Sequence, residues 1–154
     1  MPKFETTRPV SHRADQMFDL VADVERYPEF LPMCEGLKVR SRKERDGKTL
    51  LIADMTVGYK LIRETFTSQV LLKPAESLIE TKYIDGPFRY LDNRWKFVPA
   101  ENPGHSSVNF YIDYEFKSRT LGFLMGSMFD IAFRKFTEAF EKRADAIYGR
   151  PAEG

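Results

Sequence analysis

The sequence is poor in the residues that most catalytic and metal sites require. Its 154 residues include one cysteine, Cys34, and two histidines, His12 and His105. A single cysteine excludes an internal disulfide and a cysteine-based metal site, and it is typical of a reducing compartment. No histidines or acidic residues have metal-ligand spacing, and no histidine forms a nucleophile motif with Cys34. We therefore expect an inert buried thiol, a solvated His12 in the first turn of a helix, and neither a catalytic site nor a metal site.

Charge of one sign and long apolar runs are also missing. The 24 basic and 23 acidic side chains leave a net charge of +1. This balance gives no general attraction to nucleic acid, and we expect no DNA partner. No apolar stretch approaches the roughly 20 residues needed to cross a bilayer. Residues 1–5 lack the apolar core of a signal peptide, so the expected location is cytoplasmic.

Aromatic side chains, in contrast, are unusually common. They make up 14% of the chain, with 13 phenylalanines and 7 tyrosines. Rings of this size need a large interior, and they can also line a cavity for an apolar ligand. With 42% hydrophobic and 31% charged residues the composition is globular, and the length predicts a single domain over residues 1–154.

The N-terminal part predicts a strand, a helix and a short helical turn. A strand over residues 3–8 precedes a helix over residues 12–23, for which Ser11 is the expected N-cap. Residues 24–34, called the lid below, contain two prolines that prevent a regular long helix. The lid should be a compact apolar segment that presents Tyr27, Phe30 and Leu31.

From residue 36 onward, apolar residues recur every second position, which is typical of strands. Asp46-Gly47 is a strong hairpin-turn signal, and Gly58 allows a bend or bulge. A final segment without proline, residues 119–148, predicts a helix about 40 Å long. The expected strands cover residues 37–45, 49–57, 59–72, 77–84, 88–98 and 106–116.

The long helix carries an apolar stripe that is wider than contact with one neighbour requires. The stripe comprises Leu121, Met125, Met128, Phe129, Ala132, Phe133, Phe136, Ala139, Phe140 and Ile147. Hairpin-connected strands and this helix predict an α+β fold, in which a curved antiparallel sheet wraps around the C-terminal helix. The pattern leaves open whether the sheet and helix enclose a cavity or a fully packed core.

The sequence allows two orientations for the Glu64 carboxylate. Glu64 shares a strand face with Ile62 and Phe66, so it either points into the interior or is exposed by a bulge near Gly58.

The start of the long helix also allows two interpretations. An apolar cluster there, called the helix-start cluster below, is either core or a mobile mouth through which an apolar ligand enters from a membrane. In the second case Lys117, Arg119 and Arg134 would face anionic headgroups. The cluster comprises Leu121, Phe123, Leu124, Met125, Met128 and Phe129.

Several motifs together resemble the coenzyme Q-binding protein family, within the START-like, polyketide cyclase/dehydrase superfamily. They are VADVERYPEFLPMC at 21–34, ETFTSQV at 64–70, DGPF at 85–88 with Leu91 and Trp95, DYEFKS at 113–118, and AFEKRA at 139–144 with Ile147-Tyr148-Gly149. The resemblance covers residues 4–149. One departure is Met33, where the family motif has tryptophan.

The resemblance implies a helix-grip fold with a deep apolar tunnel and no enzymatic activity. It implies binding of ubiquinone or a related isoprenoid lipid, in support of respiration and quinone biosynthesis, with peripheral contact at the inner membrane and no cofactor beyond this ligand. The residues expected to contact the ligand are Tyr27, Phe30, Leu31, Met33, Ile62, Glu64, Phe66, Leu91, Trp95, Phe110, Ile112, Tyr114, Leu121, Met125, Met128 and Phe129. Glu64, Asn93 and Tyr114 are the candidates for contact with the quinone head.

Two other functions stay open. The family name also covers bacterial ribosome-association toxins, and residues 38–45 with Lys48 form a basic strand that suits ribosome contact or is simply a solvated edge. An enzymatic function, as in some members of the superfamily, would need a buried acid/base pair, for which only Glu64 with Tyr114 or Arg63 is available.

Overall fold

The computed structural model describes residues 3–59 and 61–149, and its strands form one antiparallel sheet. The sheet has seven strands in the order β1-β7-β6-β5-β4-β3-β2. In chain order the elements are β1 (Lys3–Val10), α1 (Ala14–Ala22), the 3-10 helix η1 (Val24–Glu29), β2 (Cys34–Arg45), β3 (Lys48–Tyr59), β4 (Ile62–Lys73), the 3-10 turn η2 (Pro74–Glu76), β5 (Leu78–Asp85), β6 (Phe88–Pro99), β7 (Ser106–Phe116) and α2 (Arg119–Tyr148).

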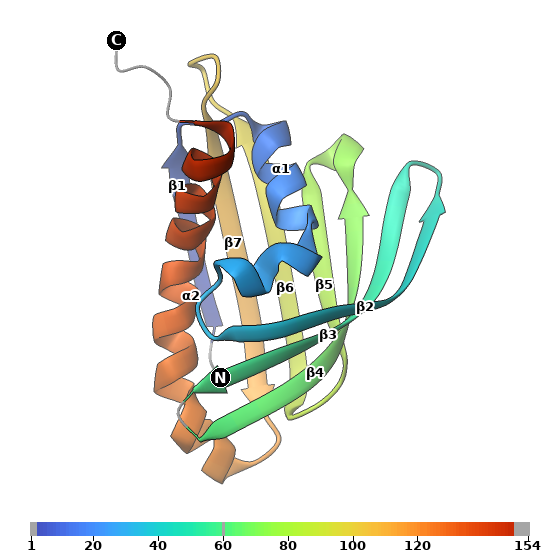
Figure 1. Ribbon diagram of the computed structural model, residues 1–154, viewed down its shortest axis with the longest axis vertical. Coiled ribbons are helices and arrows are strands. Elements are labelled where there is room, and N and C mark those ends of the chain that lie inside the picture. Colours follow the sequence, from blue (N-terminus) through green and yellow to red (C-terminus); the bar gives the residue numbers. More distant parts are fainter. Residues whose placement is uncertain (1–2, 60, 150–154) are drawn as a thin grey trace.

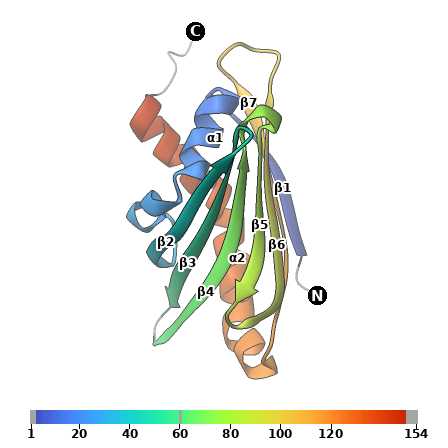
Figure 2. The same ribbon diagram turned by 90° about the vertical axis from the view of Figure 1, so that its right-hand side faces the viewer.

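The sheet curves around the long helix. Figure 1 shows α2 lying along the sheet, and Figure 2 shows α1, η1 and α2 on the same, concave side. Irregularities in strand pairing at Val39/Ser41, Thr67/Ser68 and Phe88/Tyr90 help the strands to bend. The expected α+β arrangement, with an antiparallel sheet wrapped around a C-terminal helix, is therefore confirmed.

Gly58 has a different role from the expected bulge. The pairing of β3 with β4 runs without interruption from Thr49 to Tyr59, so the strand face does not change at Gly58. Glu35 lies against this glycine, and an added Cβ would come within 1.7 Å of the Glu35 carboxylate. Regular pairing keeps Glu64 on the same face as Phe66, where it is half-buried. The bulge that would have turned Glu64 to the outer face is therefore absent.

Aromatic rings from the helix and the sheet form much of the core. Phe129 and Phe133 stack on each other along α2, with ring centroids 5.4 Å apart. On the sheet side, Phe88 stacks on Phe116 at 4.8 Å. The Trp95 ring on β6 meets Phe140 of α2 at 5.0 Å. Such pairs each contribute about 0.5–1.5 kcal/mol beyond the burial of their surface, which accounts for the high aromatic content.

His12 does not lie in solvent, as the sequence suggested. Its side chain is 3% exposed, and Nε2 lies 2.7 Å from Asp145 Oδ1 near the end of α2. The backbone carbonyl of His12 accepts a hydrogen bond of 2.8 Å from Ser106 Oγ. The expectation was wrong because its partners lie 94 and 133 residues away in the sequence.

Two helix-end expectations are also corrected. Helix α1 begins at Ala14 and its N-cap is Arg13, not Ser11, because Gln16 Oε1 accepts a hydrogen bond from the Arg13 backbone N–H. Ile147 is exposed instead of belonging to the apolar stripe of α2. The last turn of α2 contacts α1 through Tyr148, whose hydroxyl donates to the Gln16 carbonyl, so Ile147 points away. Among the described residues, no helix is long and apolar enough to span a membrane.

Candidate functional site

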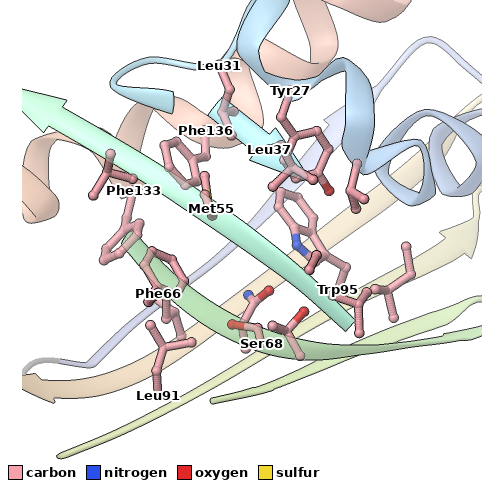
Figure 3. A pocket seen from close by; sticks show the side chains of 18 of the residues that line it. Tyr27, Leu31, Leu37, Met55, Phe66, Ser68, Leu91, Trp95, Phe133 and Phe136 are labelled. Atoms are coloured by element: carbon pink, nitrogen blue, oxygen red, sulfur yellow. The ribbon is translucent and has the colours of Figure 1, made fainter. Parts of the chain in front are cut away.

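An apolar cavity of about 110 Å³ lies between the concave face of the sheet, α2 and the lid. Figure 3 shows Phe66, Leu91 and Trp95 on the sheet side, with Phe133 and Phe136 of α2 and Tyr27 of the lid around the same space. Ligand pockets usually measure about 300–1,000 Å³. The cavity is therefore too small for a ligand of that size unless side chains move.

The lid closes one side of this cavity. The Tyr27 hydroxyl donates a hydrogen bond to the Val21 carbonyl at the end of α1, and burial raises the pKa of the Tyr27 phenol. The Phe140 ring of α2 makes edge-to-face contacts with Tyr27 at 5.3 Å and with Phe30 at 5.1 Å. Pro28 lies inside η1 and prevents a regular α-helix, as the sequence predicted. The lid is thus held to the body mainly by rings.

An ion pair also connects the outer edge of the lid to α2. Arg143 of α2 donates a hydrogen bond of 2.6 Å to Glu29, and its guanidinium lies 5.1 Å from the centroid of the Phe30 ring. Arg26 also donates to Glu29, at 3.0 Å. These contacts lie at the surface, where ion pairs contribute little to stability.

Three polar side chains, called the polar trio below, interrupt the apolar wall of the cavity. Ser68 of β4, Thr81 of β5 and Asn93 of β6 line the cavity from adjacent strands. Asn93 Nδ2 donates a hydrogen bond of 2.8 Å to the Tyr111 carbonyl. Ser68 is 6% exposed, and its hydroxyl has no hydrogen-bond partner among the described residues.

Half of the sequence-predicted contact residues line the cavity. They are Tyr27, Leu31, Phe66, Leu91, Trp95, Phe110, Ile112 and Phe129. The other eight lie outside its lining: Phe30, Met33, Ile62, Glu64, Tyr114, Leu121, Met125 and Met128.

The residues outside the lining fall into two groups. Tyr114 is buried behind the cavity, where its ring meets Phe133 at 5.3 Å and burial raises its pKa to about 12. Met125 and Met128 are buried as well. The remaining five, which include Glu64, are half-buried.

Sequence reasoning missed part of the wall. Ser68 and Thr81 were overlooked, although Ser68 alternates with Phe66 and Val70 on an otherwise apolar strand face. Phe133, Phe136 and Phe140 belong to the predicted apolar stripe of α2 but were not among the expected contact residues, yet they line the cavity. The sequence did contain a signal for Ser68 and Thr81: a polar side chain at a position that alternation places on the apolar face of a strand.

The helix-start cluster divides between interior and surface. Met125, Met128 and Phe129 are buried, whereas Phe123 is 86% exposed and Leu124 is exposed as well. Leu61, in the turn between β3 and β4, is fully exposed. Both views show this turn and the start of α2 at the same end of the molecule, away from the C-terminus (Figures 1 and 2).

The lone thiol is buried and unreactive in character. Burial raises the pKa of Cys34 to about 11, so the thiolate is scarce at neutral pH. In the described part of the chain, no group of histidine, cysteine and acidic residues is arranged to hold a metal ion.

A family model described as polyketide cyclase/dehydrase and lipid transport matches residues 10–141. The chain belongs to this family. Two proteins with similar sequences carry different names. The chain is 33% identical to the ribosome association toxin RatA of Rickettsia prowazekii, over 96% of this chain and 99% of that protein. It is 32% identical to the mitochondrial coenzyme Q-binding protein COQ10 of Dictyostelium discoideum, over 94% of this chain and 70% of that protein.

Two solved structures have the same architecture as this chain. A START superfamily protein of Mycobacterium smegmatis aligns with a TM-score of 0.78 at 22% identity, over 94% of this chain and 98% of that one. The Zhui aromatase/cyclase of Streptomyces sp. R1128 aligns with a TM-score of 0.77 at 18% identity, over 99% and 98%. At these identities the likeness shows the fold alone, and it confirms the expected helix-grip, START-like fold.

Proposed function

We propose that the protein binds an isoprenoid quinone, such as ubiquinone, or a related isoprenoid lipid in the cavity, and that it does so without catalysis. The observation that carries the proposal is the aromatic cavity between α2, the lid and the concave sheet. The family description includes lipid transport, and one relative is named as a coenzyme Q-binding protein, which supports the same ligand class.

Burial of the isoprenoid tail would supply most of the affinity. Each CH₂ group removed from water contributes about 0.8 kcal/mol, so even one isoprene unit gains several kcal/mol. Part of this gain is spent on displacing rings, because the cavity of about 110 Å³ is smaller than such a ligand. The lid and the α2 rings Phe133 and Phe136 are the wall elements whose displacement leaves the hydrogen-bonded sheet intact.

The exposed apolar residues beside the start of α2 suit entry from a membrane. Leu61, Phe123 and Leu124 are large apolar side chains exposed at this end of the molecule, and Lys117 and Arg119 lie nearby in sequence. In our proposal the three apolar side chains insert at the membrane interface and the two cations face anionic headgroups. The protein would then be cytoplasmic with peripheral contact at the inner membrane.

The lining also supports a binding function without catalysis. Among the described lining residues, the polar side chains are the polar trio and Tyr27, and none of them is a carboxylate, histidine or lysine. Glu64, the one candidate acid, lies outside the lining. General acid/base chemistry needs a titratable pair within reach of the substrate. The proposal is therefore that ligands leave unchanged.

Binding can be measured with the protein's own fluorophore. Trp95 is the single tryptophan and lines the cavity, so a bound quinone should quench its emission in a saturable way. Lipid extracted from the purified protein should contain isoprenoid quinone by mass spectrometry. If short-tail ubiquinone gives no saturable quenching and no isoprenoid lipid co-purifies, the proposal is contradicted.

Membrane contact has its own test. Phe123→Glu should reduce co-sedimentation with anionic phospholipid vesicles, because it places a charge at the inserting surface. Ile131→Glu is the matched control, since Ile131 is exposed further along the same helix. Equal vesicle binding by wild type and Phe123→Glu would exclude this surface as the contact.

A second candidate function, association with the large ribosomal subunit, is favoured by one surface. The convex face of the sheet carries two cross-strand rows of cations, called the basic rows below. Register pairs Lys96 with Leu78 and Leu78 with Lys73, while Arg94 pairs with Glu80 in the next row. The basic rows comprise Lys43, Arg45, Lys48, Lys73, Arg94 and Lys96. Acids also lie beside them, since Glu80 contacts Lys73 and Asp46 contacts Arg45.

This surface fits the phosphate backbone of RNA. Exposed cations on a face with few exposed apolar side chains suit phosphates better than a membrane interior. The relative named as a ribosome association toxin supports the same partner. The protein should co-sediment with large ribosomal subunits, and Lys43→Glu/Arg45→Glu/Lys96→Glu should weaken this association at least tenfold.

A matched control separates local from global charge. Arg134→Glu/Lys135→Glu/Lys142→Glu makes the same change in net charge on exposed α2 residues and should leave co-sedimentation nearly intact. The slope of log affinity against log salt should fall by about 2 for the first variant, because each phosphate that a cation neutralises adds about 0.7–0.9 to that slope. Absence of association even at low salt would exclude the ribosome as a partner.

A further inference from the structure

An unsatisfied hydroxyl marks one place in the cavity wall where a ligand oxygen fits. Ser68 is buried, with 6% of its surface exposed, and Ser68 Oγ has no hydrogen-bond partner among the described residues. A buried polar group without a partner is destabilising, so such groups in proteins are rare. Most other residues around the cavity are apolar, so the hydroxyl stands out against the wall.

The other two members of the polar trio, Thr81 and Asn93, lie close to this hydroxyl. Thr81 of β5 pairs directly with Asn93 of β6, and Ser68 of β4 pairs with Tyr83, two residues from Thr81 on the same strand face. Directly paired residues have Cβ atoms about 4.5–5.5 Å apart, and diagonal neighbours are about 7–8 Å apart. All three line the cavity. Their side chains therefore face one small region that a single ligand ring can reach.

The local backbone sets this arrangement. The pairing between β4 and β5 shifts between Thr67 and Ser68, where Asp85 and Tyr83 are the successive partners and Ile84 is the extra residue. Irregularities of this kind re-aim side chains and occur next to functional sites. Figure 3 shows Ser68 on the sheet between Leu91 and Trp95, beneath the open centre of the cavity.

The chemistry of the trio selects a class of ligand. The Ser68 and Thr81 hydroxyls can each donate a hydrogen bond. Asn93 uses one amide N–H for the Tyr111 carbonyl and keeps its second N–H as a donor and its side-chain oxygen as an acceptor. A neutral oxygen-bearing head satisfies such a site, and a charged head does not, because no side chain of opposite charge is among the described residues that line the cavity.

We infer that the polar trio is the head-group site of the cavity, where Ser68 and Thr81 donate hydrogen bonds to a neutral ring carbonyl or hydroxyl of an apolar ligand. This inference rests on the proposed lipid-binding function and specifies the end of the cavity at which the polar head lies. The isoprenoid tail then extends along the apolar wall toward Phe133 and Phe136.

Two variants test the site. Ser68→Ala and Thr81→Val each remove one hydroxyl with little change in shape, and each should weaken binding of short-tail ubiquinone by about 3–10-fold, as expected for a net hydrogen bond. Binding of squalene, an isoprenoid hydrocarbon without an oxygen, should be unchanged. Gln69→Ala, whose side chain lies on the opposite face of β4, is the matched control and should alter neither ligand's binding.

Stability gives a second readout that does not depend on ligand. Because the Ser68 hydroxyl lacks a partner among the described residues, Ser68→Ala should leave the melting temperature of the ligand-free protein unchanged or raise it. A lower melting temperature would show that the hydroxyl stabilises the empty fold, which overturns the assignment.

The outcomes separate the inference from the proposed function. If wild type binds both ubiquinone and squalene but the two variants keep the wild-type ratio of affinities, the head-group site is wrong while lipid binding stands. If wild type binds neither, the lipid-binding function itself fails. A selective loss of ubiquinone affinity in both variants supports the assignment.

Discussion

Truncation of Phe140 tests how strongly α2 and the lid are held together. Phe140 is 1% exposed and lines the cavity, and its ring meets Tyr27, Phe30 and Trp95. Phe140→Ala removes this ring from the junction of helix, lid and sheet. The loss combines the burial of an apolar side chain with three edge-to-face contacts.

The size of the effect follows from these two parts. Burial of a phenylalanine side chain contributes about 1.5–3 kcal/mol. The three ring contacts, at 5.0 to 5.3 Å, each add about 0.5–1.5 kcal/mol. The lower half of the resulting range overlaps the about 3–5 kcal/mol typical of buried phenylalanine truncations in other proteins. We expect Phe140→Ala to lower the free energy of unfolding by about 4 kcal/mol.

Urea denaturation followed by Trp95 fluorescence measures this loss, and thermal unfolding should show it as a fall of about 8–16 °C. Phe123→Ala is the matched control, because it makes the same truncation on the same helix at a residue that is 86% exposed. It should change stability by less than about 0.5 kcal/mol. A loss below about 1.5 kcal/mol for Phe140→Ala, or equal losses for the two variants, would refute the assigned packing.

Three further predictions address the cavity, the thiol and the buried histidine. Ala53→Leu fills part of the cavity, so the quinone affinity measured by Trp95 quenching should fall at least tenfold while stability stays within about 1 kcal/mol of wild type. Ala75→Leu, on exposed η2, is the control, and it should change neither stability by more than this amount nor quinone binding. The pKa of Cys34 is raised from 9.0 to about 11, so the folded state holds the proton that the unfolded state loses; stability should fall as pH rises through that window, and Cys34→Ala should lessen the fall. His12→Leu removes the bond to Asp145 and should cost about 2–3 kcal/mol in denaturant titrations, whereas His105→Leu in the loop before β7 should cost little; equal costs would contradict the pairing.

The regular elements were predictable from the sequence because their signals are local. Alternation marked β7, and the proline-free stripe of α2 predicted both bounds of the helix, 119–148, as the structure has them. Asp46-Gly47 correctly placed the turn between β2 and β3, and both residues have positive φ there. In each case the residues that carry the signal lie within a few positions of the element that they define.

The features that were not predictable depend on partners far along the chain. His12 has the sequence context of a solvated first-turn residue, and only Asp145, at the other end of the molecule's sequence, explains its burial. Ile147 continues the helical stripe of α2 but is exposed, because Tyr148 rather than Ile147 contacts α1 in the last turn. Periodicity assigns a face to a residue, whereas the neighbour on that face is decided by tertiary packing.

The candidate site was partly predictable for the same reason. Trp95, Phe110 and Ile112 face inward by simple alternation, and they line the cavity. Of the polar trio, the sequence pointed to Asn93 but not to Ser68 and Thr81. A serine or threonine among apolar residues is common on exposed strands, and its inward orientation matters only once the pairing of β4, β5 and β6 is known.

The cavity wall has a fixed part and a movable part. Strands β4, β5 and β6 each pair on both sides, so the polar trio rests on backbone that is hydrogen-bonded to two neighbours. The lid is a 3-10 segment interrupted by Pro28, and its rings rather than a ladder of hydrogen bonds hold it against Phe140. A polar head-group site on the fixed wall, opposite a wall that can be displaced, suits a carrier. The head can be recognised with constant geometry, while the tail is accommodated by rings that give way.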